Sequence, residues 1–230
     1  MVVKKKKSTK NTKTSKIIKN VGKISKPKLE KEFYQKYRWF FTKSGKLVYG
    51  GKSAEQNEEV VRDLIKSKKN RIIMHTKIPG SPFAVIDDYV GSVTLKDMDE
   101  AAIWTACFSR AWRNGLKKTT IDIFLSEQLV KKSGMSAGTF GVIGKIDRVT
   151  VELKLALCKQ KDILRAAPLE SCNGKKLAVI VPGNIEKEEF AKQISDKLKI
   201  DKEEILNALP TGGFGMGKWR WGIWERYLQQ

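Results

Sequence analysis

The segment of the sequence that decides the fold is residues 37–57, which read YRWFFTKSGKLVYGGKSAEQN. Its aromatic-rich part, residues 37–42, is typical of a strand, and Ser44-Gly45 then favours a turn. Residues 47–49 return as the second strand of a hairpin, which Gly50-Gly51 ends. We therefore expect a β-hairpin at the start of the folded region.

A helix is expected directly after this hairpin. Ser53 with Gln56 three residues later has the capping-box pattern, and apolar residues recur at helical spacing over residues 54–66. Farther along, the sequence predicts strands over 71–76, 83–87, 119–125, 138–145, 149–157 and 176–181, and helices over 94–114, 190–198 and 201–209. This irregular alternation predicts an α+β fold with a mixed or antiparallel sheet and packed helices.

Composition divides the chain into three parts. Residues 1–30 are a lysine-rich tail with no core-forming pattern, so we expect it to be disordered. Residues 31–165 are expected to form the main domain. Residues 168–230 are expected to form a small α/β extension that ends in a segment rich in glycine and tryptophan.

Positive charge is concentrated in the tail. The 230 residues carry a formal net charge of +21, and residues 1–28 hold 11 lysines and no acidic residue. A basic tail on a basic domain most often binds nucleic acid, although a tail that only aids solubility is the alternative. The tail lacks the broad apolar face of a membrane-surface helix, and no apolar run approaches the roughly 20 residues that span a bilayer. We expect a nucleic-acid partner and no membrane.

Cysteine and histidine usage argues against a metal site and a secreted protein. The chain has three cysteines and one histidine, with no CxxC pair. The lysine-rich N-terminus is not followed by the apolar stretch of a secretory signal. We therefore expect reduced, mostly buried thiols in a cytoplasmic protein without a metal or other cofactor.

The turn after the hairpin is the first candidate binding site. Gly50 and Gly51 would let the backbone approach a ligand, and Lys52 precedes a helix N-terminus, which favours phosphate. A tight turn that needs glycine for its geometry is an equally weighted alternative. Gln56 and Asn57 could read a base or a 2′-hydroxyl, or could cap neighbouring backbone.

Further candidates are basic or histidine residues on strands, helix faces and loops. A P-loop-like match at residues 212–218 is rejected because Trp219 stands where a hydroxyl residue is required and no strand precedes the match. The basic and aromatic residues after it could instead stack on unpaired bases or dock into a protein surface. The further nucleic-acid candidates are Arg38, His75, Lys77, Arg110, Arg113, Lys131, Lys132, Lys145, Lys218 and Arg220.

A set of motifs spread over residues 36–157 points to a known family. They include Tyr37-Arg38-Trp39-Phe40-Phe41-Thr42, Gly50-Gly51-Lys52-Ser53 with Gln56-Asn57, Ser109-Arg110-Ala111-Trp112, Glu127-Gln128-Leu129-Val130-Lys131-Lys132 and Gly144-Lys145. Together they resemble the NFACT-R domain, the predicted RNA-binding module of the NFACT proteins, which act in ribosome-associated quality control. The resemblance implies an NFACT-R-like domain over residues 31–165 that contacts RNA.

The sequence departs from the family pattern at one motif. The family usually has His-x-Asp-x-His-Gly, whereas residues 75–80 read His-Thr-Lys-Ile-Pro-Gly. Lysine replaces the acid and proline replaces the second histidine, which argues against a proton-transfer or metal role for that pair.

Three function classes follow from these observations. The resemblance implies an RNA-binding protein that contacts ribosomal RNA or tRNA, with the large ribosomal subunit as a candidate partner. Lysines outnumber arginines 37 to 9, which favours contact with phosphates over reading of bases. A DNA-binding or nucleoid-type protein is the alternative, and a nucleic-acid-processing enzyme is disfavoured because the sequence has no metal-ligand or catalytic cluster. We expect no enzymatic activity.

Deleting residues 1–28 should weaken binding to all polyanions alike. The tail supplies 11 positive charges, and each phosphate that it neutralises adds roughly 0.7 to 0.9 to the slope of log K against log salt. Filter binding of full-length and truncated protein to RNA at several salt concentrations measures this slope. An unchanged slope would show that the tail does not touch nucleic acid.

Overall fold

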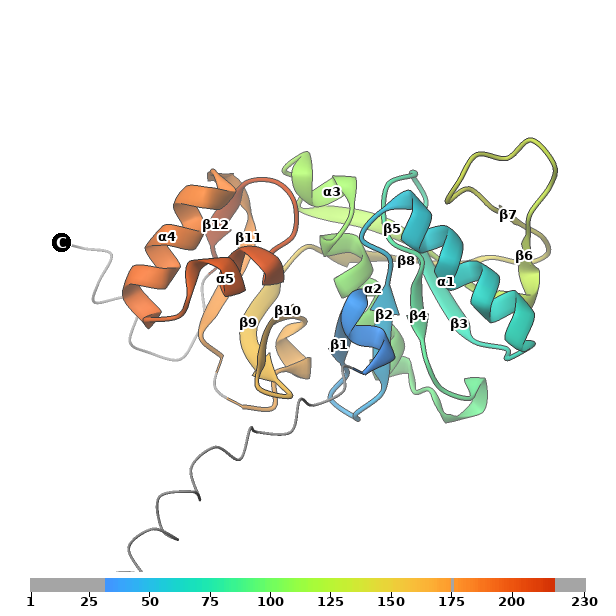
Figure 1. Cartoon of the computed structure of the whole chain (residues 1–230), viewed down its shortest axis with the longest axis horizontal. Coiled ribbons are helices and arrows are strands. Elements are labelled where there is room, and N and C mark those ends of the chain that lie inside the picture. The colour runs from blue at the N-terminus through green and yellow to red at the C-terminus, as the bar shows by residue number, and fades with distance from the viewer. Residues whose placement is uncertain (1–31, 175, 218–230) are drawn as a thin grey trace, which may run out of the picture. The chain divides into compact units, whose positions relative to one another are not determined.

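The computed structural model describes residues 32–174 and 176–217 (Figure 1). Its β-strands and α-helices all belong to a unit that begins at Tyr34. The predictions for the disordered tail, for Lys218 and Arg220 and for the tryptophan-rich end lie outside the described residues. Within the described part, antiparallel sheets and packed helices confirm the expected α+β class.

The larger sheet has six strands in the order β1-β2-β4-β3-β5-β8, and every neighbouring pair is antiparallel. The predicted hairpin is confirmed, with Phe40 opposite Val48. The strands are β1 (Arg38–Phe41), β2 (Leu47–Gly50), β3 (Ile72–Thr76), β4 (Ala84–Ile86), β5 (Lys118–Leu125) and β8 (Asp147–Glu152). Short 3-10 helices η2 (Phe33–Lys36), η3 (Val90–Ser92), η4 (Ser126–Gln128) and η5 (Leu169–Ser171) connect elements.

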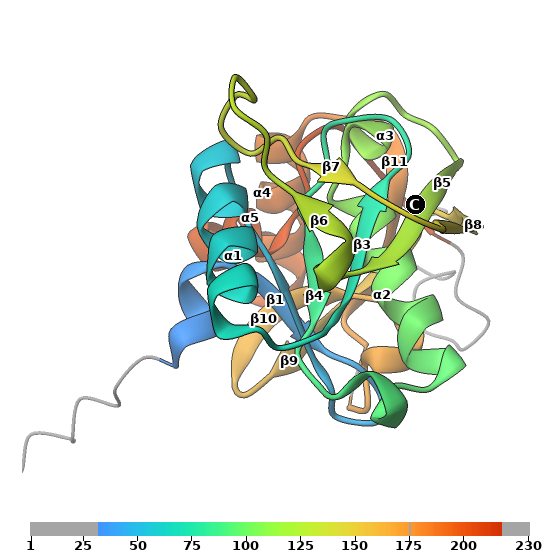
Figure 2. The same ribbon diagram turned by 90° about the vertical axis from the view of Figure 1, so that its right-hand side faces the viewer.

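Two helices cover opposite faces of this sheet, as Figure 2 shows. Helix α1 (Ala54–Ser67) packs on the face to which Ile73 and Val85 point. Helix α2 (Leu95–Cys107) packs on the other face, with residues such as Met74 and Ile86. Adjacent residues of one strand thus enter different cores, because side chains alternate across a sheet. Both faces are buried, which explains the continuous apolar runs of β3 and β4.

The second sheet has four strands in the order β10-β9-β11-β12. Helices α4 (Lys187–Leu198) and α5 (Lys202–Ala208) pack with it, and its core is continuous with the core under α2. The sheet spans the boundary expected near Pro168, and the division of the chain into domains stays a prediction. Its strands are β9 (Leu155–Gln160), β10 (Ile163–Ala167), β11 (Ala178–Ile185) and β12 (Phe214–Met216).

The helix expected over residues 94–114 is two helices. The capping box of Thr94 and Asp97 begins α2 as predicted, but α2 ends at Cys107 and α3 (Arg110–Arg113) follows. Ser109 accounts for the break, because its hydroxyl accepts a hydrogen bond from the Ala111 N–H and so caps a new helix.

Two strand predictions are wrong in their extent. Residues 149–157 alternate without interruption, yet the chain divides between β8 and β9, which belong to different sheets. Residues 138–145 form a mostly irregular loop in which β7 (Gly141–Val142) pairs with β6 (Leu129–Val130). Gly138 and Gly144 have φ angles of +71° and +82°, which are incompatible with a strand.

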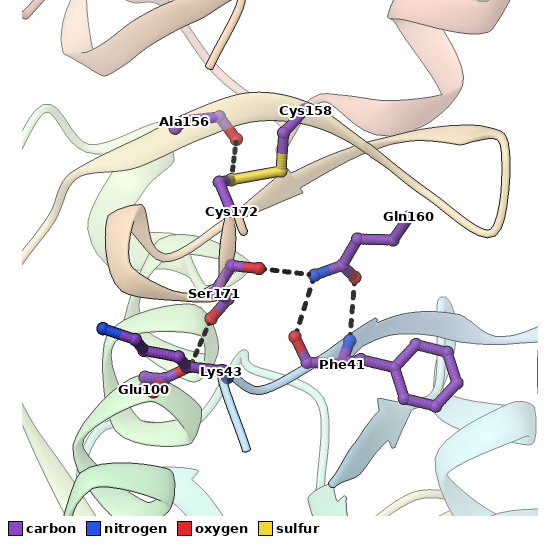
Figure 3. Close-up of a disulfide and its surroundings, with 8 residues drawn as sticks. All are labelled: Phe41, Lys43, Glu100, Ala156, Cys158, Gln160, Ser171 and Cys172. Carbon is purple, nitrogen blue, oxygen red and sulfur yellow. Dashed lines mark hydrogen bonds between the residues drawn. A yellow bond between two sulfur atoms is a disulfide. The ribbon is translucent and has the colours of Figure 1, made fainter. Parts of the chain in front are cut away.

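Hydrogen bonds between polar side chains and backbone join the two sheets (Figure 3). Gln160 of β9 accepts a hydrogen bond from the Phe41 N–H at 2.8 Å and donates to the carbonyl oxygens of Phe41 and Ser171. The buried carboxylate of Glu100 accepts bonds from the Ser171 hydroxyl at 2.5 Å and the Lys43 N–H at 2.8 Å. These bonds fix the end of β1 against the second sheet.

The cysteines differ from the expectation of reduced thiols. Cys158 and Cys172 form a disulfide between β9 and the segment after η5 (Figure 3). The two residues lie 14 positions apart in the sequence and adjacent in space, a proximity that their spacing alone did not reveal. Cys107 is a free, buried thiol, as expected, and burial raises its pKa.

The turn between β1 and β2 is held by Asp97. Its carboxylate accepts hydrogen bonds from the hydroxyls of Thr42 and Ser44 at 2.6 Å and from that of Thr94 at 2.7 Å. Burial alone would raise the pKa of Asp97, but these hydroxyl groups lower it to about 2. The charged form is therefore favoured in the folded state.

Asp97→Asn should remove part of the stability and flatten its dependence on acid pH. The folded-state pKa of about 2 lies below the unfolded value of about 3.9. The contribution of Asp97, about 2 kcal/mol, is therefore complete above about pH 4 and lost as the pH falls toward 2. Urea unfolding at pH 7, 4 and 2.5 measures it, with the exposed Asp99→Asn as the control. Equal pH dependence in Asp97→Asn and the original protein would contradict this role.

Candidate nucleic-acid interface

A basic cleft of about 640 Å³ lies where the β2–α1 turn, the β3–β4 loop and α3 meet. The described residues of its wall include five cations and one carboxylate, Asp122, which is already bonded to Arg148 at 2.8 Å. The cleft thus has a surplus of positive charge, which favours a polyanion. The five cations are Arg38, Lys52, Lys77, Arg110 and Arg113.

The glycines of the β2–α1 turn are required by packing. A Cβ on Gly50 would lie 2.8 Å from Pro82 Cβ, and one on Gly51 would lie 2.5 Å from Asn57 Oδ1. Gly51 lines the cleft, whereas Gly50 is a buried strand residue outside its lining. Close packing therefore explains why both positions are glycine. Lys52, which follows them in the turn, lies on the cleft wall.

The side chains of Gln56 and Asn57 form hydrogen bonds with backbone groups. Gln56 accepts a hydrogen bond from the Lys52 N–H at 2.9 Å. Asn57 accepts one from the Phe83 N–H at 3.3 Å and donates to the Ser81 carbonyl oxygen at 3.5 Å. Asn57 therefore ties α1 to the loop that forms the opposite wall, while Gln56 lies outside the lining of the cleft.

Gly80 lets Arg110 lie across the β3–β4 loop. Its φ of +120° favours glycine, and an added Cβ would lie 2.5 Å from Arg110 Cδ. The Arg110 N–H also donates to the Gly80 carbonyl oxygen at 2.9 Å. This bond joins the start of α3 to the β3–β4 loop at the cleft wall.

Lys131 holds a loop and is not an open phosphate contact. Its ammonium group is bonded to Glu58 at 2.7 Å and to the carbonyl oxygens of Ser136 and Thr139. It also lies 4.6 Å from the ring centre of Phe140. The bond to Lys131 is the main reason that the pKa of Glu58 falls to about 2. Residues 131–140 are thereby fixed against α1, and residues 137–140 line the cleft.

The remaining basic candidates lie outside the lining of the cleft. Lys145 is exposed and paired with Asp147 at 3.0 Å, and Lys132 is exposed on the loop. Lys218 and Arg220 lie outside the described residues. The structure thus gathers these sequence candidates in the cleft: Arg38, Gly51, Lys52, Asn57, His75, Lys77, Arg110 and Arg113.

Aromatic rings add apolar surface to the same cleft. Phe83 lies 5.6 Å from Phe140 in an edge-to-face arrangement, measured between ring centres. The ring of Phe108 is 4.9 Å from the guanidinium carbon of Arg38. Cations interleaved with aromatic rings are the combination that binds phosphates and unstacked bases.

Comparison with known proteins identifies the family of the segment that forms this cleft. Residues 36–144 match the family described as the NFACT protein RNA binding domain. Residues 36–144 are an NFACT RNA-binding domain. The match includes nearly all of the cleft lining, with Thr211 as the exception.

Curated relatives carry names from ribosome quality control. The archaeal Rqc2 homolog aRqcH of Methanocaldococcus jannaschii is 29% identical over 198 residues, which is 80% of this chain and 29% of the relative. The ribosome quality control complex subunit NEMF homolog of Drosophila melanogaster is 30% identical over 141 residues, which is 58% of this chain and 14% of the relative. The chain thus spans less than a third of either relative.

One solved structure is also similar, the C-terminal part of the fibronectin/fibrinogen-binding protein from Streptococcus suis. The TM-score is 0.43 at 23% identity, over 60% of this chain and 53% of the other.

The described residues of the NFACT RNA-binding domain and its surroundings offer no cluster of three or more acidic, cysteine or histidine side chains that could hold a metal. Within the same residues, no helix combines the length and the apolar character needed to cross a membrane.

Sequence reasoning missed two basic residues next to the NFACT RNA-binding domain. Arg165 and Lys187 line a second pocket of about 370 Å³ together with Arg38 and Lys52. The sequence could have indicated Arg165, because it is a charged residue within the otherwise apolar strand of residues 163–167 and has no acidic residue next to it. Lys187 gives no such signal, since it begins a helix that is rich in lysine.

His75 is held in a neutral form at the wall of the cleft. Its Nδ1 lies 2.7 Å from the Thr76 carbonyl oxygen, so Nδ1 carries the proton and donates it. The ring stacks on Phe83 with 4.6 Å between centres. Burial lowers the pKa of His75. The unprotonated Nε2 is therefore an acceptor and not a cation at neutral pH.

The only histidine of the chain should titrate below its usual value of about 6.5. Because folding favours the neutral ring, its contribution to stability is present above pH 6.5 and falls as the pH drops below that value. NMR of ¹⁵N-labelled protein should show the Nδ1–H tautomer and a single titration. The urea-unfolded protein is the control. A folded-state pKa at or above 6.5, or the Nε2–H tautomer, would contradict this assignment.

Proposed function

We propose that this chain binds ribosomal RNA or tRNA through the basic cleft and acts in ribosome-associated quality control. The observation that carries the proposal is the convergence of five cations on one cleft inside an NFACT RNA-binding domain. The names of the archaeal and Drosophila relatives support the process. In this proposal the protein is a cytoplasmic binding module without enzymatic activity, and the large ribosomal subunit is its candidate partner.

Charge supplies affinity in this proposal, and the cleft supplies selectivity. Lys52, Lys77 and Arg113 have no ion-pair partner among the described residues. Each can neutralise a phosphate, which releases counterions and makes binding sensitive to salt. The fixed walls on either side, α1 and the β3–β4 loop, restrict which backbone shapes fit. Structured RNA is recognised mainly through such shape and phosphate contacts.

DNA is the second candidate, since the same cations would bind its phosphates. Competition between an RNA duplex and a DNA duplex of the same sequence separates the two. Preference for RNA would support the proposal, and equal or tighter binding of DNA would favour the alternative. Incubation of labelled RNA with the protein and magnesium tests whether the RNA is processed. The proposal expects the labelled RNA to stay intact.

Reversing two cleft charges should weaken RNA binding far more than reversing two charges elsewhere. Lys77→Glu with Arg113→Glu removes two exposed cations from the cleft. Loss of two charge-assisted contacts should lower affinity for tRNA or ribosomal RNA by about tenfold or more. Filter binding at two salt concentrations and co-sedimentation with ribosomes measure the loss.

The matched control is Lys159→Glu with Lys192→Glu, which changes the net charge equally at exposed positions outside both pockets. Circular dichroism confirms that both variants fold. Equal losses in the two double variants would show that net charge alone governs binding, and this would contradict the assignment of the cleft.

A further inference from the structure

The second pocket lies beside the cleft and collects four cations from distant parts of the chain. Arg38 comes from β1, Lys52 from the β2–α1 turn, Arg165 from β10 and Lys187 from α4. The pocket measures about 370 Å³, which is within the size range of small-ligand sites. Among the residues that the structure describes, no acidic one lines it. Four like charges around a cavity without a counter-charge are an arrangement that an anion would stabilise.

None of the four cations forms an ion pair within residues 32–174 and 176–217. The two carboxylates whose charge acts on them are engaged elsewhere. Glu204 accepts the Leu164 N–H at 3.0 Å, and Glu188 is bonded to Lys202 at 2.6 Å. Burial lowers the pKa of all four cations, and repulsion from Arg38 lowers it further in Lys52, Arg165 and Lys187.

Aromatic rings, not carboxylates, orient the two arginines. The guanidinium carbon of Arg165 lies 4.6 Å from the ring centre of Trp39, and that of Arg38 lies 4.9 Å from Phe108. A guanidinium that stacks on a ring keeps its N–H groups available in the plane of the fork. This is the geometry that binds the oxygens of a phosphate in pairs.

Two buried donors on the pocket wall lack acceptors. The indole Nε1 of Trp104 and the Nε of Arg165 have no hydrogen-bond partner within the described residues. The Trp104 side chain is 1% exposed, so water in bulk solvent does not satisfy it. A buried donor without an acceptor is destabilising, and native proteins rarely leave one without a functional reason.

We propose that the second pocket binds a phosphate group, held by the four cations and the indole N–H of Trp104. The cations supply charge complementarity, and the two unpartnered N–H groups can donate hydrogen bonds to phosphate oxygens. Because the pocket and the cleft share Arg38, Lys52 and Phe108, the phosphate can come from an RNA that occupies the cleft or from a free phosphate compound. The first of these sources rests on the proposed function, but the site itself does not.

Inorganic phosphate is the direct probe, titrated calorimetrically into the full chain in chloride buffer. Three variants each remove one group: Arg165→Met, Lys187→Met and Trp104→Phe. Methionine keeps the apolar stem that packs on the pocket wall. Each variant should bind phosphate about tenfold more weakly or worse. Lys192→Met, an exposed lysine of the same helix as Lys187, is the control and should bind like the original protein.

The source of the phosphate is tested with two single-stranded RNA oligonucleotides that differ in a 5′-phosphate. Tighter binding of the phosphorylated oligonucleotide, lost in Lys187→Met but not in Lys192→Met, would identify an RNA end. Equal binding of the two that Lys187→Met weakens would identify an internal phosphate of the RNA. Equal binding that Lys187→Met leaves unchanged, with inorganic phosphate still bound by the pocket, would identify a free phosphate compound. If RNA does not bind at all, the proposed function fails while the phosphate titration still tests the pocket.

Two results would overturn the proposal. One is the absence of phosphate binding by the original protein at millimolar concentration. The other is phosphate binding that Arg165→Met and Lys187→Met leave unchanged, which would place the anion elsewhere. Lys187→Met changes a partly exposed residue at the start of α4, so it keeps the test valid if Trp104→Phe fails to fold.

Discussion

The buried carboxylates of α2 are the constraint on which the rest of the structure depends. Asp97 binds the hydroxyls of Thr42 and Ser44, and Glu100 binds the Lys43 N–H, so one helix fixes the whole β1–β2 turn. Glu100 also accepts a hydrogen bond from the Ser171 hydroxyl, which ties the segment after β10 of the second sheet to α2. Removing either carboxylate would leave a buried hydroxyl, that of Thr42 or of Ser171, without its acceptor and would break further partly buried bonds. Because β1 is fixed at this end, Arg38 at its other end has a defined place between the two pockets.

The molecule uses its charges in two distinct ways. Lys46 with Asp88 and Lys131 with Glu58 are paired and stabilise turns and loops of the scaffold. The cations of the cleft and of the second pocket lack such partners in the described residues, and Arg165 is partly buried as well. A buried cation without a counter-charge is unfavourable for stability. Its presence is therefore better explained by an anionic ligand than by the needs of folding.

Local signals in the sequence predicted the hairpin, α1 and the start of α2, because turn glycines and capping residues act within a few positions. The break at Ser109 and the division of residues 149–157 depend on tertiary contacts, so an uninterrupted pattern concealed them. The same limit applied to the site. Several motif residues line one cleft, but spacing could not show that Lys131 is paired with Glu58, 73 positions away in the sequence. Nor could it show that Arg165 and Lys187 converge on Arg38.

The shared wall between the two pockets makes their occupants interdependent. Arg38 and Lys52 contribute to both, so an anion bound in one pocket reduces the positive potential available to the other. Two separate anions would therefore compete for the same charges. A single RNA that places adjacent phosphates in both pockets avoids this competition, because linkage makes its second contact intramolecular. The shared position of Arg38 thus favours one continuous polyanion across both pockets over two independent ligands.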